Sequence, residues 1–264
     1  MFYRHAIDDA LDTSVGAKGL SRTSLDHELE RLRPALDKLR QWHKDGTLPM
    51  LRLPAARDDL AALKPHARRF AKFKNVVVIG SGGSSLSGKA LMALGDQGFG
   101  PAKRRPKMYF MDNVDPATFT ELLARLPLAK TGFLVISKSG GTAETLTAFF
   151  TIIAGIEAAL DKATLASNVI VVTEAADNPL RRLATRLGCT ILEHDPKIGG
   201  RYSVFSLVGM LPALIAGIDA AAIREGAASV LDPVLAATEP AALAPAIGAA
   251  LSVGLARERG LNIT

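Results

Sequence analysis

Two loops rich in serine and glycine, each following an apolar run, set the strongest limit on what this chain can fold into. The first loop is Gly80–Ser85 after residues 76–79, and the second is Ser137–Thr142 after residues 133–136. Short apolar runs of this kind are typical of parallel strands buried on both faces. Each loop is therefore expected to join a strand to a helix, where free N–H groups and the helix dipole favour an anion. The sequence predicts two turns suited to phosphate.

The two loops differ from the better-known phosphate-binding motifs. The first reads Gly-Ser-Gly-Gly-Ser-Ser and lacks the third spaced glycine of the dinucleotide pattern, and neither loop has the Walker spacing. A single loop of this kind is equally compatible with a plain tight turn between a strand and a helix. Two loops with the same small residues and hydroxyls favour phosphate binding, because small residues allow close backbone approach and hydroxyls add donors.

Strand-like and helix-like segments alternate between residues 75 and 193. Short runs rich in β-branched or aromatic residues predict five strands, at 75–80, 106–111, 131–137, 168–173 and 189–193. Helix-length segments lie between them, at 84–95, 115–125, 142–160 and 178–187. This alternation predicts an α/β fold with a doubly wound five-stranded parallel sheet, covered by helices on both faces. Both loops then lie at the carboxyl edge of the sheet, near a topological switch point where ligands bind.

Helical segments are expected on both sides of this region. Residues 24–44 and 58–73 predict an N-terminal helical layer, with Pro34 kinking or splitting the first helix. The C-terminal part is rich in alanine and predicts further helices, with breaks near Pro233 and Pro240. The expected regions are a helical layer at 1–74, an α/β domain at 75–218 and a helical connection at 219–264.

Composition argues against several classes of site and partner. The one cysteine, Cys189, permits no disulfide within the chain, and the five histidines show no spacing typical of metal ligands. We expect no metal site and no cofactor. The net charge of +6 suits an anionic partner, but the basic residues are scattered along the chain, so nucleic acid is not expected.

The sequence also argues against a membrane protein. Two long uncharged stretches, 202–218 and 241–256, are shorter than the ~18–20 apolar residues that span a bilayer, and we expect both to be buried helices. The first residues are mixed and charged, unlike a targeting segment. We therefore expect a cytoplasmic protein with no membrane partner.

A third segment, residues 198–203, follows the last predicted strand and reads Ile-Gly-Gly-Arg-Tyr-Ser. Its two glycines allow the backbone to turn sharply beside a ligand, and Arg201 supplies a planar, permanently charged fork that can stabilise an oxyanion. Alone, the motif is equally compatible with an ordinary turn and a surface arginine. Its position after the fifth strand lets it reach the same sheet edge as the two loops.

In this order, the three segments resemble the phosphoglucose isomerase family. The two loops are shared with the wider sugar isomerase (SIS) domain family, and Gly199–Ser203 followed by an apolar helix narrows the resemblance. The resemblance covers about residues 20–264. It implies that the α/β domain is a flavodoxin-like SIS domain. It also implies interconversion of glucose 6-phosphate and fructose 6-phosphate, a step of glycolysis and gluconeogenesis.

The resemblance assigns roles to residues of the three segments. It implies that Gly83 and Ser84 border the sugar phosphate, and that Gly200 and Arg201 lie at the reacting carbons, with Arg201 catalytic. The residues that it implies for the phosphate are Ser137, Lys138, Ser139 and Thr142. Two positions depart from the family pattern. Gly141 stands where a hydroxyl residue is more common, and Pro196 where an acidic or amide residue is more common.

The implied chemistry moves a proton between two carbons and needs a carboxylate base as well as a cation. In the family the glutamate base, the ring-opening histidine and a late lysine lie downstream, beyond Thr264, and residues 261–264 resemble the start of a strand. Glu144 at a helix start and, before the arginine turn, Glu193, His194 and Asp195 are candidates for a local base, but for Glu144 the helix dipole favours an acid in any protein, and we favour none of the four. We expect His194 to be a hydrogen-bonded surface residue rather than a catalytic one.

Two hypotheses follow. In the first, the chain is the portion of an isomerase that contains the first SIS domain, and the complete protein is a homodimer. The chain alone is then expected to be inactive, and its apolar helices after Tyr202 to self-associate. In the second, the chain is a non-catalytic SIS-type module that binds or senses a sugar phosphate. The partner is a sugar phosphate in both.

Overall fold

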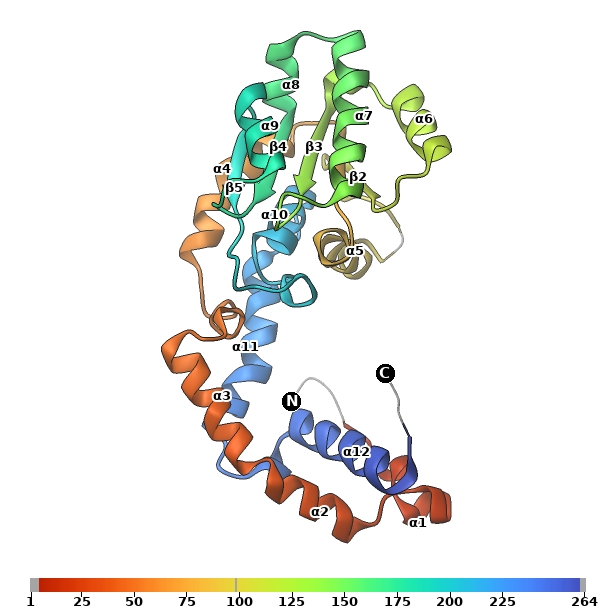
Figure 1. The fold of residues 1–264 in the computed structure, drawn as a ribbon, viewed down its shortest axis with the longest axis vertical. Helices are drawn as coiled ribbons and strands as arrows, with labels where there is room; N and C mark the ends of the chain where they lie inside the picture. Colours follow the sequence, from red (N-terminus) through yellow and green to blue (C-terminus); the bar gives the residue numbers. More distant parts are fainter. Residues whose placement is uncertain (1–4, 98, 262–264) are drawn as a thin grey trace. The chain divides into compact units, whose positions relative to one another are not determined.

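A five-stranded sheet forms the centre of the α/β region in the computed structural model, which describes residues 5–97 and 99–261 (Figure 1). Its strands are β1 (Asn75–Ile79), β2 (Lys107–Met111), β3 (Thr131–Ile136), β4 (Val169–Thr173) and β5 (Thr190–Glu193). Neighbouring strands are parallel, in the order β2-β1-β3-β4-β5. This is the flavodoxin-like order of a doubly wound sheet, so the predicted fold class is confirmed. The switch point lies between β1 and β3.

Helices cover both faces of the sheet, because β1, β3 and β4 are buried throughout and neighbouring side chains point to opposite faces. Val76, Val78 and Leu134 face one core, which includes α4 (Asp58–Phe70), α5 (Gly83–Asp96) and α10 (Leu207–Ala216). Val77 and Phe133 face the other core. The helices there are α6 (Pro116–Arg125), α7 (Ala143–Ala159), α8 (Lys162–Asn168) and α9 (Pro179–Leu187) (Figure 1).

The apolar helix α10 belongs to the first of these cores. It is buried from Val208 to Ala213 and packs against α4 and α5. The expectation of a buried helix within 202–218 is therefore confirmed. The expectation that apolar helices after Tyr202 are left free to self-associate is wrong for α10, because α4, α5 and the sheet already cover its apolar residues.

The chain divides into two compact units. The sheet unit is Leu48–Glu225, and the terminal unit combines Met1–Thr47 with Gly226–Thr264. In the terminal unit, α2 (Arg22–Arg31) packs against α12 (Ala244–Arg259) around Leu25, Leu29 and Leu251. The terminal unit also holds α1 (Asp12–Val15), α3 (Arg33–Asp45) and the later part of α11 (Ala220–Ala236). The domain ranges 1–74, 75–218 and 219–264 stay a prediction.

Proline positions set two of the three predicted helix boundaries. Pro34 lies in the first turn of α3, so the helix predicted at 24–44 is split, as expected. The break near Pro240 is confirmed by a short 3-10 helix, Pro240–Ala242. The break near Pro233 is wrong, since α11 continues to Ala236. Pro233 and Ser229 are both exposed, so the carbonyl that loses its N–H partner stays in contact with water.

The remaining short elements are 3-10 turns at Asp8–Ala10, Gly16–Lys18, Pro49–Arg52 and Leu128–Lys130. Across residues 5–97 and 99–261, no helix combines the length and the apolar character needed to cross a membrane. Residues 262–264 of the predicted final strand lie outside the described residues.

Candidate functional site

The first loop turns from β1 into α5 beside the end of β3. Gly82 has a φ of 55°, in the left-handed region that favours glycine. A Cβ at Gly80 would lie 2.8 Å from the carbonyl oxygen of Ile136, so a side chain there would push the loop away from β3. Gly83 and Ser84 are half-buried in the first turn of α5. The loop is therefore a strand-to-helix turn at the carboxyl edge of the sheet, as predicted.

The second loop joins β3 to α7 and is fixed by its own side chains. Ser137 is 3% exposed, and its Oγ lies 3.0 Å from Oγ1 of Thr142. Gly140 has a φ of 62°, and the side chain of Asn178 occupies the space that a Cβ would need. Ser139 is exposed. The hydroxyls of Ser137 and Thr142 are thus paired with each other, while Ser139 faces solvent.

Lys138 extends from the second loop to the segment that precedes the Gly-Gly-Arg turn. Its Nζ donates to the carbonyl oxygen of Pro196 at 3.0 Å. Its own carbonyl oxygen accepts from the N–H of Glu174 at 3.0 Å and from Oγ1 of Thr173 at 3.2 Å. Lys138 therefore links the second loop to the third segment, and its role in holding phosphate stays a prediction.

The third segment packs against the first loop. Gly200 and Arg201 lie in a 3-10 helix, Gly200–Tyr202, and a Cβ on Gly83 would overlap the backbone of Gly200. Oγ of Ser203 donates to the carbonyl oxygen of Gly200 at 2.7 Å and lies 3.0 Å from Oγ of Ser87 on α5. Arg201 is exposed. These contacts, with those of Lys138 and Gly80, bring the three segments to one edge of the sheet.

The local candidates for a base differ in their surroundings. His194 is 3% exposed, so the expectation of a surface residue is wrong. Its Nδ1 lies 2.8 Å from the carbonyl oxygen of Asp195, an acceptor, so Nδ1 carries the proton. Burial lowers the pKa of His194, opposed by the bond to Asp195, and the nearby charge of Lys138 lowers it further. His194 is therefore a neutral imidazole near pH 7.

The two glutamates lie nearer to solvent. Glu193 is exposed at the end of β5, and its Oε1 lies 3.3 Å from Nη2 of Arg181. Glu144 is exposed in the first turn of α7, where an acid complements the helix dipole. Neither side chain reaches the third segment through a hydrogen bond recorded for the described residues.

A very small cavity lies at the carboxyl edge of the sheet, beside the ends of β1 and β2 and the start of α7. Gly80, Ser81, Glu144 and Thr145 are among its lining residues, and its volume of about 10 Å³ is close to the space that one water molecule needs. Oγ1 of Thr145 is buried without a protein partner among the described residues. This cavity by itself is too small to hold a sugar.

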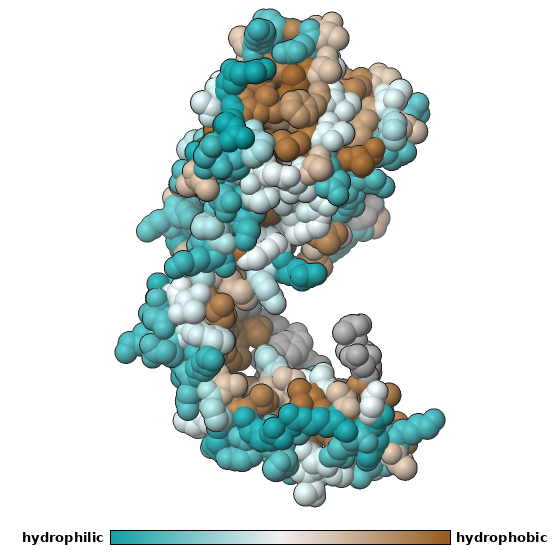
Figure 2. Space-filling view, in the orientation of Figure 1, coloured by the Kyte–Doolittle hydropathy of each residue, from teal (hydrophilic) through white to brown (hydrophobic). Residues whose placement is uncertain are grey.

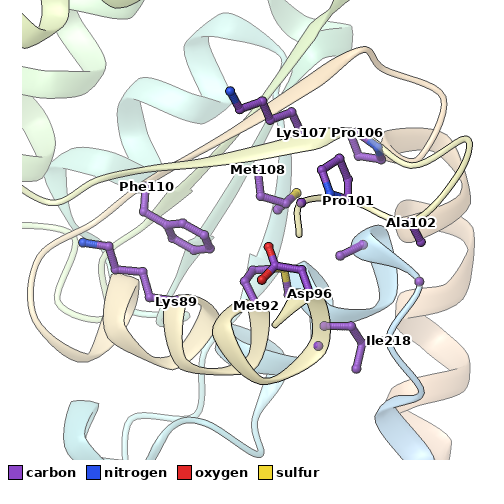
Figure 3. A pocket seen from close by; sticks show the side chains of 14 residues that line it. Lys89, Met92, Asp96, Pro101, Ala102, Pro106, Lys107, Met108, Phe110 and Ile218 are labelled. Atoms are coloured by element: carbon purple, nitrogen blue, oxygen red, sulfur yellow. The ribbon is translucent and has the colours of Figure 1, made fainter. Parts of the chain in front are cut away.

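A larger cavity of about 420 Å³ lies away from the three segments (Figure 3). Met108 and Phe110 of β2 line it opposite Met92 and Asp96 of α5, with Ile218 below. None of the predicted site residues lines this cavity.

Groups that could hold a metal ion, and the one cysteine, were compared with the predicted site. Between residues 5 and 261, residue 98 excepted, no group of three or more His, Cys, Asp or Glu is placed to hold a metal ion. Burial raises the pKa of Cys189 to about 11, so its thiol stays protonated near neutral pH.

Sequence reasoning missed the side chains that support the third segment. Ser87 and Ser203 are 7% and 1% exposed, and Arg224 of α11 is fully buried with a bond to the carbonyl oxygen of Phe205. The helical period offered one signal, because Ser87 lies one turn after Gly83 and so shares its face of α5. Arg224 gave no such signal, since its partners are distant in sequence.

Comparison with known proteins identifies relatives that match most of this chain. A family model described as phosphoglucose isomerase matches residues 60–261. A glucose-6-phosphate isomerase of Rubrobacter xylanophilus is 34% identical over 251 residues, covering 93% of this chain and 56% of the relative. One from Carboxydothermus hydrogenoformans is 34% identical over 215 residues, covering 79% and 46%. The chain thus spans about half the length of the curated relatives it matches.

Solved structures agree with this match. A hypothetical protein from Thermus thermophilus has a TM-score of 0.73 at 28% identity, and the alignment covers 89% of this chain and 55% of that one. A glucose-6-phosphate isomerase from Chlamydia trachomatis has a TM-score of 0.61 at 27% identity, with 74% and 37% covered.

Proposed function

The chain belongs to the phosphoglucose isomerase family, and from this premise we propose that its three segments bind glucose 6-phosphate or fructose 6-phosphate in an aldose–ketose isomerase site. The observation that carries the proposal is the backbone contact between Gly83 and Gly200, which brings Arg201 to the loops suited to phosphate. Relatives named glucose-6-phosphate isomerase support the choice of substrate. The reaction belongs to glycolysis and gluconeogenesis.

We assign the phosphate to the two Ser/Gly loops. Each loop leads into a helix of 14 or 17 residues, α5 or α7, whose N-terminal N–H groups and dipole favour an anion. Ser139 and Ser84 add hydroxyl donors, and the Ser137–Thr142 pair fixes the shape of the second loop. Lys138 contributes its charge while its Nζ is bonded to Pro196.

We assign to Arg201 the stabilisation of the negative charge that develops on the substrate oxygens during proton transfer. Isomerisation passes through an enediolate, and a planar guanidinium can donate two parallel bonds to its oxygens. Arg201 is exposed at the edge and is held by a Gly-Gly turn rather than among the phosphate donors. It therefore acts at the reacting carbons, with Gly200 beside it.

We place the base and the ring-opening groups in the part of the relatives' length that this chain does not span. Glu193 is paired with Arg181, and the lowered pKa of His194 makes it a weaker base.

The complete protein is proposed to be a cytoplasmic homodimer that binds neither nucleic acid nor membranes. A non-catalytic sugar-phosphate-binding module is the second candidate, favoured by the pairing of Glu193 with Arg181 and by the lowered pKa of His194.

The double variant Ser139→Ala with Thr142→Ala tests the assignment. The variant loses the bond of Ser139 to phosphate, which contributes roughly 1.5–3 kcal/mol, and the contact of Thr142 with Ser137 that fixes the loop, so fructose 6-phosphate should bind at least tenfold more weakly, as measured by calorimetry. Thr147→Ala, at an exposed position further along α7, is the matched control and should bind as the wild type does. Equal affinity of a folded double variant and the control would refute the shared phosphate site.

A further inference from the structure

Arg224 is a charged side chain that is buried completely, and none of the binding or catalytic roles proposed above uses it. Its guanidinium donates to both carboxylate oxygens of Asp59, at 2.6 and 2.5 Å, and to the carbonyl oxygen of Ala56 at 2.8 Å. Two further bonds, at 2.6 and 3.1 Å, go to the carbonyl oxygen of Phe205. Every nitrogen of the fork therefore has a partner, which a buried guanidinium requires.

Phe205 lies four residues after Arg201, near the end of residues 196–206, which we call the arginine segment. This segment is a chain of turns: the N–H groups of Tyr202, Ser203 and Ser206 donate to carbonyls within it. Other elements hold it at three points. Lys138 bonds to Pro196 before the turn, Ser87 contacts Ser203 in the middle, and Arg224 bonds to Phe205 at the end.

Stability alone is a weak reason for Arg224. The guanidinium is fully buried whereas the Asp59 side chain is 42% exposed, so the cost of desolvating Arg224 offsets much of its attraction to a partly solvated carboxylate. A lysine would place one charge near Asp59 but could not donate to Asp59 and Phe205 in the same plane. The guanidinium therefore has a geometric role. Its hydrogen bonds connect α11 to the start of α4 and to the end of the arginine segment.

We propose that Arg224 is a positioning residue for Arg201. It holds the carbonyl of Phe205 in place and thereby fixes the arginine segment that carries Arg201. This inference rests on the proposed function of Arg201. Asp59 orients the guanidinium, and Ser87 and Ser203 complete the support. Burial raises the pKa of Asp59, but the bonds and charge of Arg224 outweigh it and hold that pKa below its usual value. Asp59 therefore stays ionised, and the clamp intact, at neutral pH.

Amide hydrogen exchange of the full chain tests the clamp without any ligand. In Arg224→Met we expect the amides of Tyr202, Ser203 and Ser206 to exchange about tenfold faster or more, while amides of β1 and β3 change less than about twofold. Arg57→Met is the matched control. Arg57 also donates to carbonyls just before α4, those of Pro54 and Ala56, and no bond from it to Phe205 is found among the described residues.

A second variant covers the case in which Arg224→Met does not fold. Arg224→Lys keeps a cation beside Asp59 and loses the fork, so it should show the same selective exchange. Uniform acceleration across the sheet unit, or no change in the three amides, would mean that Arg224 only stabilises the unit and would overturn the proposal.

A double-mutant cycle adds the functional readout. The probe is 5-phospho-D-arabinonate, whose carboxylate imitates the enediolate oxygens, and its affinity is measured by calorimetry. Arg224→Met should weaken binding to the wild-type chain several-fold and have no further effect on Arg201→Met, because coupled residues are not additive. Additive losses would overturn the positioning role. If the wild-type chain binds neither this anion nor fructose 6-phosphate, the proposed function fails, while the exchange result still decides whether Arg224 holds the segment.

Discussion

The two adjacent glycines of the second loop have different surroundings and should respond differently to substitution. Gly140 has a positive φ and its space is filled by Asn178, whereas a Cβ on Gly141 would have its nearest neighbour at 4.0 Å. Gly140→Ala should lower the free energy of unfolding by about 2 kcal/mol or more, from left-handed strain and overlap. Gly141→Ala should change it by less than about 0.5 kcal/mol. Urea unfolding of both variants provides the comparison, and equal losses would contradict this geometry.

Burial of His194 predicts a pH dependence of stability. Its folded-state pKa is lowered, chiefly by burial, so the unfolded chain binds more protons below about pH 6.5. The contribution of His194 is therefore present above pH 6.5 and lost as the pH falls toward the folded pKa. His194→Asn keeps a donor for the carbonyl of Asp195 but cannot titrate, so its stability should fall less between pH 7 and pH 5. Identical slopes for wild type and variant in urea unfolding would contradict the account.

The residues of the two Ser/Gly loops could be recognised from the sequence, whereas the directions of the side chains around them could not. The Ser/Gly loops stand out because small residues and hydroxyls follow buried runs. That Lys138 reaches Pro196, and that His194 is buried beneath the turn, depends on how the chain after β5 folds back over the second loop. No local pattern encodes that path.

Among the secondary-structure elements, α10 gives the most specific prediction about stability. It lies inside the core of the sheet unit, with Leu211 fully buried. Leu211→Ala should lower the free energy of unfolding by about 2–5 kcal/mol, the range for a cavity left by a buried leucine. Leu94→Ala is the matched control, because Leu94 of α5 is 76% exposed, and it should be close to neutral. A small effect of Leu211→Ala in thermal or urea unfolding would place α10 outside the core.

β1, β3 and β4 were predictable because burial on both faces makes them continuous apolar runs, and the edge strands β2 and β5 were predictable from their β-branched and aromatic residues. α8 was missed, since its seven residues are too few to show a helical period and are identified by the cap that Asp161 provides to Thr164. α9 begins as predicted, with Asn178 accepting from the N–H of Arg181 ahead of Pro179. A side-chain cap marks the start of both helices.

At the scale of the whole molecule, apolar surface is found on helices that flank the predicted site rather than on α10. Leu86 and Leu94 of α5 are 58% and 76% exposed, and Phe150 of α7 is 55% exposed. Figure 2 shows apolar residues gathered on the side of the sheet unit that α7 to α9 cover. Self-association of the chain stays a prediction, and α5 and α7 are the helices to examine for it.

The central claim is that three segments separated in sequence form one sugar-phosphate site. Titration of the isotope-labelled chain with fructose 6-phosphate, followed through the amide resonances of Ser84, Ser139 and Arg201, tests it most directly. We predict that all three resonances shift along one binding curve, and that inorganic phosphate shifts mainly the first two. Shifts confined to one loop, or separate curves for the loops and Arg201, would contradict the claim.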